Sequence, residues 1–225
     1  MPSSVQRETR TIPIVASVAE PVASGIVPRL NQPGGNITGF AAFEASLGGK
    51  WLELLSEIAP GLKRAAIMFN PDFPVASPYM PSLETAARSL KVVLITAPVH
   101  SDAEIETAII TLGRESGGGL VVYGSFMLAH RASIISAAAR NSVPAVYWTS
   151  DFARDGGLLS YGVGRVDLFR RAASYVDCIV RGAKPTELPV QLPTKFEMVV
   201  NRKTANALGL AIPPSILLRA DEVIE

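Results

Sequence analysis

Polar and aromatic side chains recur at the points where short apolar runs of this 225-residue sequence end. Open parallel sheets bind ligands at the carboxyl ends of their strands, so residues in these positions are the first candidates for a binding site. A tyrosine there can stack on a planar ligand while its hydroxyl makes a polar contact. The candidates are Glu20, Thr38, Phe43, Ser46, Asn70, Tyr123, Ser125, Tyr147, Asp151 and Tyr161.

The charges in this set suit an amino-acid-like solute. Glu20 and Asp151 are expected to receive an amine, and backbone N–H groups at the helix starts near Ser46 and at residues 70–73 to receive a carboxylate. For any single residue, a solvated strand end or a helix cap is the more ordinary explanation. Core packing is the alternative for Tyr123 and Tyr147. The recurrence at one topological position is what favours a site.

Motifs for catalysis, metals and phosphates do not stand out in the sequence. His100, His130 and Cys178 offer no cluster with metal-ligand spacing, and surface or capping roles are expected for both histidines. The stretch "SGGGL" precedes a strand, and "SLGGK" lacks the first glycine and the final hydroxyl residue of a P-loop. We therefore expect no metal, no cofactor and no enzymatic activity.

Composition narrows the class of protein further. Lys and Arg total 21 against 20 for Asp and Glu, which gives no basic field for nucleic acid. No apolar run is long enough to span a bilayer. The start "MPSSVQRETR" does not resemble a secretion signal, so the chain as written is expected in the cytoplasm. Cys178 cannot form an internal disulfide and is expected to pack as a small apolar residue.

Short apolar runs alternate with longer amphipathic ones, which is the α/β pattern. Several of the short runs are apolar throughout, as in parallel strands that are covered on both faces. The expected strands cover residues 12–18, 36–40, 65–70, 92–99, 120–125, 145–148, 158–161 and 196–201.

The amphipathic runs predict helices between these strands. One helix is expected to start after Ser46 as N-cap and to stop before Pro60. Ser101 and Glu104 have capping-box spacing at the start of another. A long helix is expected over 167–182, with Leu168, Ala172, Tyr175, Val176 and Ile179 facing inward.

The stretch "EPVASGIVPRLNQPGGNITGFAAFEASLGGKWLELLSEIAPGLKRAAIMFNP" resembles ABC-transporter substrate-binding proteins with the type I periplasmic binding-protein fold. The likeness continues through "RRAASYVDCIVRGAKPTELPVQLPTKFEMVVNRKTANALGL" and covers almost the whole chain. Its phrases are similar to those of an uncharacterised or aromatic-amino-acid-type branch. The resemblance implies a non-enzymatic, periplasmic protein that binds a small solute between two lobes and presents it to an ABC permease.

The same resemblance implies two α/β lobes with parallel sheets joined by three crossovers. Residues 1–60 with 162–194 would form lobe one, and 61–157 with 195–225 would form lobe two. The segments "LLSYG" and "KFEMVVN" would be hinge strands. Two local departures concern the ligand: Glu20 stands where the family usually has Asp, and Tyr123-Gly124-Ser125 where it often has Pro-Asp.

A third departure is length. Members of the family usually carry about a hundred residues, including an export signal and β-α units, before the strand at Ile12, and a sheet without those central strands exposes unpaired edges. Lobe one is therefore expected to be truncated at its N-terminus. A homodimer formed through the sheet edge near residues 12–18 is expected to cover that edge.

The main hypothesis is the solute-binding component of an ABC import system for an amino-acid-like, possibly aromatic, molecule. One alternative is a ligand-sensing regulatory module of the same fold, because a fold does not settle function. Another is a truncated homologue that self-associates and binds no solute. An α/β enzyme would need a catalytic base, and none is visible.

Overall fold

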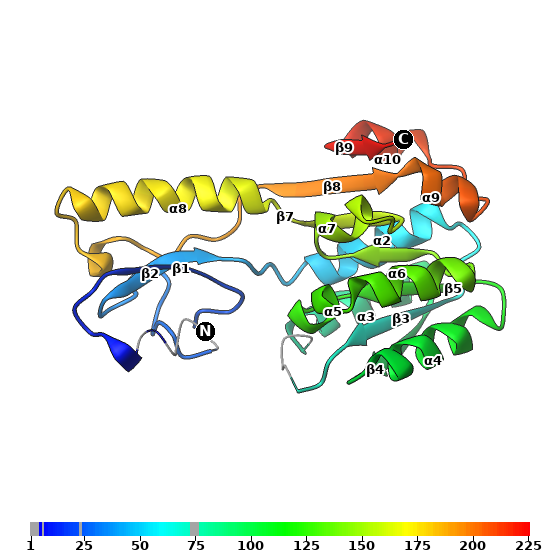
Figure 1. The fold of residues 1–225 in the computed structure, drawn as a ribbon, viewed down its shortest axis with the longest axis horizontal. Coiled ribbons are helices and arrows are strands. Elements are labelled where there is room, and N and C mark those ends of the chain that lie inside the picture. Colours follow the sequence, from blue (N-terminus) through cyan, green and yellow to red (C-terminus); the bar gives the residue numbers. More distant parts are fainter. Residues whose placement is uncertain (1–4, 6, 23, 73–76) are drawn as a thin grey trace. The chain divides into compact units, whose positions relative to one another are not determined.

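The computed structural model describes residues 5, 7–22, 24–72 and 77–225, and the chain divides into two compact units (Figure 1). Unit 1 is Met1–Glu44 with Val163–Phe196, and unit 2 is Ala45–Gly162 with Glu197–Glu225. The chain therefore passes between the units at residues 44/45, 162/163 and 196/197. The last two passages lie within strands, in the segments that the sequence marks as hinge strands.

Unit 2 is built on a sheet with the strand order β4-β3-β5-β6-β7-β8-β9 among the described residues. The pairs β3–β4, β3–β5, β5–β6, β6–β7 and β8–β9 are parallel. This sheet confirms the α/β class with parallel strands. The strands are β3 (Arg64–Phe69), β4 (Val93–Pro98), β5 (Gly118–Val122), β6 (Ala145–Tyr147), β7 (Leu159–Val163), β8 (Phe196–Asn201) and β9 (Glu222–Ile224).

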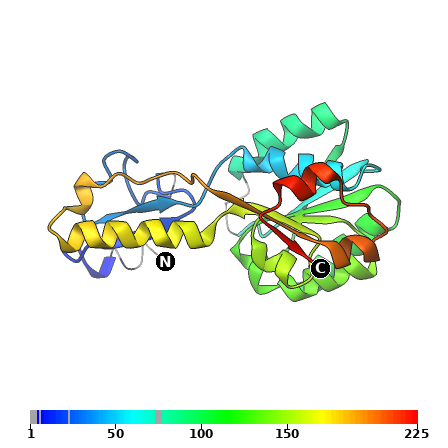
Figure 2. The ribbon, with the colours of Figure 1, turned by 90° about the horizontal axis from the view of Figure 1, so that it is seen from above.

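Helices cover both faces of this sheet (Figure 2). An ideal Cβ on Gly119 of β5 would meet Leu55, which lies on one face of the sheet. The next residue, Leu120, packs with Ile105 and Ile134 in the core on the other face. One face is covered by α2 (Leu47–Ile58), η1 (Ser77–Tyr79) and α3 (Met80–Leu90), and the other by α4 (Asp102–Gly113) and α6 (Arg131–Arg140). The shorter helices are α5 (Ser125–Ala129), α7 (Ser150–Arg154), α9 (Arg202–Ala207) and α10 (Pro214–Arg219).

Unit 1 contains the parallel pair β1 (Ile14–Val18) and β2 (Ile37–Ala41), with the long helix α8 (Arg165–Val180) and the turn η2 (Pro185–Glu187). Its core is apolar: Phe40 of β2 packs on Tyr175 of α8, with ring centroids 4.9 Å apart. Helix α8 contacts both strands of this sheet. The small sheet is therefore covered by α8 on one face.

The inward face of α8 is narrower than the sequence predicts. Leu168 and Tyr175, two turns apart, are buried, but Val176 is 49% exposed and was expected to face inward. Phe169 is also exposed, and Cys178 lies on the surface instead of packing as an apolar residue. The described part of unit 1 offers α8 only a two-stranded sheet, which covers one line of its side chains.

The expected lobe boundary near residue 60 was wrong, because α2 belongs to unit 2. Helix α2 packs on α3 and on strands β5 and β6, so the first passage between units lies at 44/45. Two local expectations also differ from the structure. The strand expected over 120–125 ends at Val122 as β5, and Ser125 is the first residue of α5. The strand β9 was not predicted, because Glu222–Ile224 is too short to show an alternation of apolar and polar residues.

Candidate functional site

Strand register brings Tyr123, Trp148 and Tyr161 to one level at the carboxyl edge of the unit 2 sheet. Val122 pairs with Tyr147, and Tyr147 pairs with Ser160, so the following residue of each strand lies in one row. The rings of Tyr123 and Trp148 meet edge to face, with centroids 5.7 Å apart. Successive side chains alternate across a sheet, so this row faces the side opposite to Tyr147.

Two further aromatic rings support this row from α2 and η1. The Trp51 ring stacks on Tyr123 at 5.4 Å and contacts Tyr79 at 4.9 Å. Its indole Nε1 donates a 2.6 Å hydrogen bond to the backbone oxygen of Tyr161. Trp51 and Tyr79 are 1% and 2% exposed, and Tyr123 is 8% exposed. Trp148 is more exposed than these three rings, so a solute can reach it more readily than it can reach them.

The indole N–H of Trp148 is a polar group without a protein partner in the described part of the chain. Its Nε1 is buried from solvent and has no hydrogen-bond acceptor there. A buried donor left unpaired costs about 1–3 kcal/mol. A solute acceptor would recover that free energy only after a rearrangement that exposes Nε1.

The glycines of "SLGGK" position this aromatic cluster. An ideal Cβ on Gly48 would lie 2.6 Å from the backbone oxygen of Tyr79, so only glycine lets α2 approach η1 this closely. The Ser82 hydroxyl donates to the backbone oxygens of Ala45 and Tyr79 and accepts from the N–H of Gly49. The motif thus has a packing role that holds Tyr79 against Trp51.

The Gly48→Ala variant should lose stability because its added methyl group must displace the backbone at Tyr79. Overpacking of this kind costs about 1–3 kcal/mol. The matched control is Gly61→Ala, since a Cβ on Gly61 meets nothing within 4 Å. Chemical denaturation of both variants measures the difference, and equal stabilities would contradict the close-packing role of Gly48.

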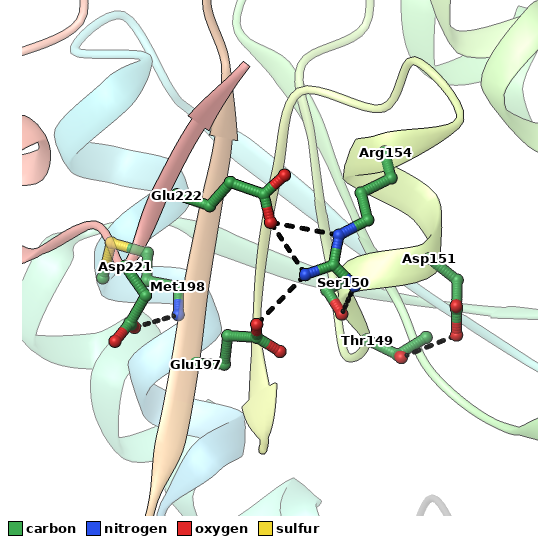
Figure 3. Close-up of polar contacts among 8 residues, drawn as sticks. All are labelled: Thr149, Ser150, Asp151, Arg154, Glu197, Met198, Asp221 and Glu222. Carbon is green, nitrogen blue, oxygen red and sulfur yellow. Dashed lines mark hydrogen bonds and ion pairs between the residues drawn. The ribbon is translucent and has the colours of Figure 1, made fainter. Parts of the chain in front are cut away.

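Polar groups lie at the same edge of the sheet. Asn70 follows β3, is 6% exposed, and accepts a 2.8 Å hydrogen bond from the N–H of Asp72. Thr149 follows Trp148 and donates to the Asp151 carboxylate at 3.1 Å, as Figure 3 shows. Phe73, another expected contributor of a backbone N–H group, lies outside the described residues. The edge therefore combines aromatic faces with the carboxylates of Asp72 and Asp151 and the amide side chain of Asn70.

Two predicted site residues have structural roles instead. Tyr147 is 1% exposed, and its ring stacks on Phe152 with centroids 4.5 Å apart in the core. Burial raises the pKa of its phenol, so Tyr147 stays neutral and inward. Thr38 is 2% exposed and donates a 2.6 Å hydrogen bond to the backbone oxygen of Leu188. The side chains of Tyr147 and Thr38 therefore pack in the interior of their own units.

The remaining candidates occupy more open positions. Ser46, just before α2, and Ser125, the first residue of α5, are both exposed. The side chain of Ser46 does not cap α2. Phe43 and Glu20 belong to unit 1 and are partly buried. Burial raises the pKa of the Glu20 carboxyl above its ordinary value of 4.5. Burial on folding therefore removes part of the hydration that the ionised form of Glu20 has in the unfolded chain.

The raised pKa of Glu20 predicts a pH dependence of stability. Folding disfavours the ionised carboxylate, so the contribution of Glu20 to the stability of the folded chain is fully present below pH 4.5 and decreases as the pH rises through the raised pKa. Glu20→Gln should remove this decrease. Thermal unfolding from acidic to neutral pH measures it, with Glu53→Gln as the exposed control. Parallel curves for wild type and Glu20→Gln would contradict the prediction.

The site depends on residues that sequence reasoning passed over. From the sequence, Trp51 was expected only within the helix between Ser46 and Pro60, and Trp148 only at the end of the strand over 145–148. The signal for Trp148 is the pair "YW" after a buried run, but choosing between Tyr147 and Trp148 requires knowing the face of the sheet.

Metal chemistry finds no support among the described residues, where no group of three His, Cys, Asp or Glu could hold an ion. His100 bonds to Glu104 at the start of α4, and His130 bonds to Asp102, as expected of surface and capping roles. The Ser101 hydroxyl accepts from the N–H of Glu104 as the capping box predicts. In the described part of the chain, no helix could cross a membrane.

Comparison with known proteins gives the chain a family. Residues 3–224 match the family model described as ABC transporter substrate binding protein. A tyrosine-binding protein of Clostridioides difficile is 23% identical over 203 residues, or 90% of this chain and 58% of that protein. The chain thus spans little more than half the length of this curated relative.

Solved structures are similar over nearly the whole chain. An ABC domain in complex with L-Trp from Streptococcus pneumonia is 22% identical, with a TM-score of 0.86 over 99% of this chain and 75% of that one. A conserved domain protein from Vibrio cholerae is 27% identical, with a TM-score of 0.84 and the same coverage. The fold is that of type I periplasmic binding proteins, and the chain belongs to the ABC transporter substrate-binding protein family.

Proposed function

We propose that this chain is the solute-binding component of an ABC import system and that its solute is an aromatic amino acid. The observation that carries the proposal is the aromatic cluster at the carboxyl edge of the unit 2 sheet, with Trp148 as its accessible ring. The relative named for tyrosine binding and the similar structure that holds L-Trp support the same class of solute.

In this proposal Trp148 and Tyr123 contact the aromatic ring of the solute, and Asp151 receives its ammonium group. Edge-to-face and stacked ring pairs contribute about 0.5–1.5 kcal/mol beyond the burial of their area. Asn70 offers an amide for a polar group of the solute. Glu20 and Phe43, which the resemblance assigns to the other lobe, are the proposed contributors from unit 1. Tyr161 contributes through the backbone oxygen that fixes Trp51.

Isothermal titration of the chain with L-tyrosine, L-tryptophan and L-leucine tests this function. Binding of the aromatic amino acids with a clear preference over L-leucine is the expected result. Ribose and other sugars serve as controls for the broader fold. If no heat of binding is measured and millimolar solute leaves the melting temperature unchanged, the proposal is contradicted.

The Asp151→Asn variant should bind the amino acid more weakly than wild type, because it removes the charge that pairs with the ammonium group. A charge-assisted hydrogen bond contributes about 1.5–3 kcal/mol, or roughly tenfold or more in Kd. Tyramine, which keeps the amine, should lose the same factor, whereas 3-(4-hydroxyphenyl)propionate should not. Equal loss for both analogues would place the ammonium group elsewhere.

The proposal includes import of the solute into the cell and a location of the protein outside the membrane. Both follow from the family, whose members bind small molecules and deliver them to a permease. A homodimer through the edge of β1 also stays a proposal. Among the described residues β1 has β2 as its strand neighbour, so its other edge is available to a second copy. Light scattering at micromolar concentration tests it, and a stable monomer would overturn it.

A further inference from the structure

Arg154, the last residue of α7, joins three segments of unit 2 through its guanidinium group (Figure 3). Nε and Nη2 donate to one Glu222 oxygen at 3.1 and 2.7 Å. Nη2 also donates to Glu197 at 3.1 Å, and Nη1 donates to Ser150 at 3.1 Å. The sequence offered no reason to select this arginine. It ties α7 to β8 and β9 at once.

These contacts connect the candidate site to a strand that passes between the units. The segment from Trp148 to Asp151 includes the first two residues of α7. Glu197 is the first residue of unit 2 after the chain leaves unit 1 within β8. A movement of α7 that followed contact of a solute with Asp151 or Trp148 would therefore act on the start of β8 through the guanidinium group of Arg154.

The C-terminal end of α7, where Arg154 lies, is also held by two hydrogen bonds that do not involve the Arg154 side chain. The Asn201 amide, 4% exposed, donates to the backbone oxygen of Ala153 at 3.1 Å, and the Thr204 hydroxyl donates to that of Gly156 at 2.8 Å. Both partners lie at the end of β8 or in α9. Loss of Arg154 would leave these bonds in place, so the helix would stay attached while its link to the start of β8 is released.

We propose that Arg154 is a positioning residue: it fixes the segment Trp148–Asp151 relative to the start of β8, where the chain passes between the units. For solute binding this inference rests on the proposed function, but the fixation of the segment does not. Arg154 does not contact the solute in this scheme. The guanidinium group is flanked by two carboxylates, so it both bridges Glu197 and Glu222 and offsets their mutual repulsion.

The test compares Arg154→Met with Arg154→Lys and with Arg140→Met. Arg140 forms an exposed ion pair with Glu106 on α4 and α6, away from the site, and serves as the matched control. Amide hydrogen exchange in residues 148–153 should become about tenfold faster in Arg154→Met, and Kd for an aromatic amino acid should rise by roughly the same factor. Arg154→Lys should recover part of both, because an ammonium group keeps the charge but not the fork.

A triple variant, Arg154→Met with Glu197→Gln and Glu222→Gln, separates positioning from repulsion. The triple variant should regain the wild-type melting temperature. Its amide exchange in residues 148–153 should stay fast, and its affinity for an aromatic amino acid should stay low. Wild-type exchange in residues 148–153 in Arg154→Met, or full recovery in the triple variant, would overturn the proposal. If wild type binds no amino acid, the proposed function fails, and the exchange measurement by itself decides whether Arg154 fixes the segment.

Discussion

Replacing Trp148 with alanine should weaken the binding of an aromatic amino acid about a hundredfold, because the site loses a partly exposed ring that contacts the solute in the proposed function. Buried aromatic anchors at binding sites commonly contribute 2 kcal/mol or more on truncation, and each 1.4 kcal/mol changes Kd about tenfold. The Trp148 ring also packs on Tyr123, so its removal leaves that ring without its edge-to-face partner. Calorimetric titration of the variant with L-tyrosine and L-tryptophan measures the loss.

Two controls separate contact with the solute from loss of structure. Trp148 packs against the core of unit 2, so the alanine variant also loses stability. Trp148→Phe keeps a smaller ring in place and removes the indole N–H, and it should bind more weakly than wild type but more tightly than the alanine variant. Tyr147→Phe changes the neighbouring core residue and should leave Kd unchanged. Unchanged affinity in Trp148→Ala would remove Trp148 from the site.

Gly162→Ala should cause a large loss of stability. An ideal Cβ at this position would lie 1.8 Å from the backbone oxygen of Trp148 and 2.9 Å from its carbonyl carbon, and a backbone atom cannot rotate away. Overpacking typically costs 1–3 kcal/mol and sometimes more. For a chain of this size about 3 kcal/mol corresponds to roughly 6–12 °C in Tm. Thermal unfolding measures the loss.

Gly164 provides a matched control two residues further along. Its φ is −65°, which any residue can adopt, and a Cβ there would lie at ordinary distances of 3.5 Å or more from its neighbours. Gly164→Ala should therefore be close to wild type in Tm. Gly162→Ala should also weaken binding, because the carbonyl that must move belongs to Trp148. Similar melting temperatures for the two variants would contradict the close approach of β7 to Trp148.

Gly162 also lies next to the passage between units at 162/163. The close approach and the passage therefore share a few residues of β7, and Arg154 links the same site segment to β8, the other strand that passes between units. Glycine at position 162 thus leaves room for the backbone of Trp148. The stretch "SYGVG" does not by itself show this role.

The sequence by itself determined the α/β class and most of the strands of unit 2, whereas the short β9 gave no signal. Apolar runs of strand length bounded by Pro and Gly predict buried parallel strands, and this local signal survives folding because both faces of such a sheet are covered. The quoted motifs also identified the family. Helix α2 was predicted nearly to its ends, but its lobe was not, because an apolar stripe does not name the surface that it covers.

Only the tertiary structure decided which aromatic residue faces the site. In a run that is buried on both faces, Tyr147 and Trp148 are equally apolar neighbours, and a one-residue difference in register exchanges their environments. Pairing with β5 and β7 turned Tyr147 toward Phe152 and placed Trp148 beside Tyr123. The contacts of Arg154 and Gly162 likewise join residues far apart in the chain, and no local pattern encodes such contacts.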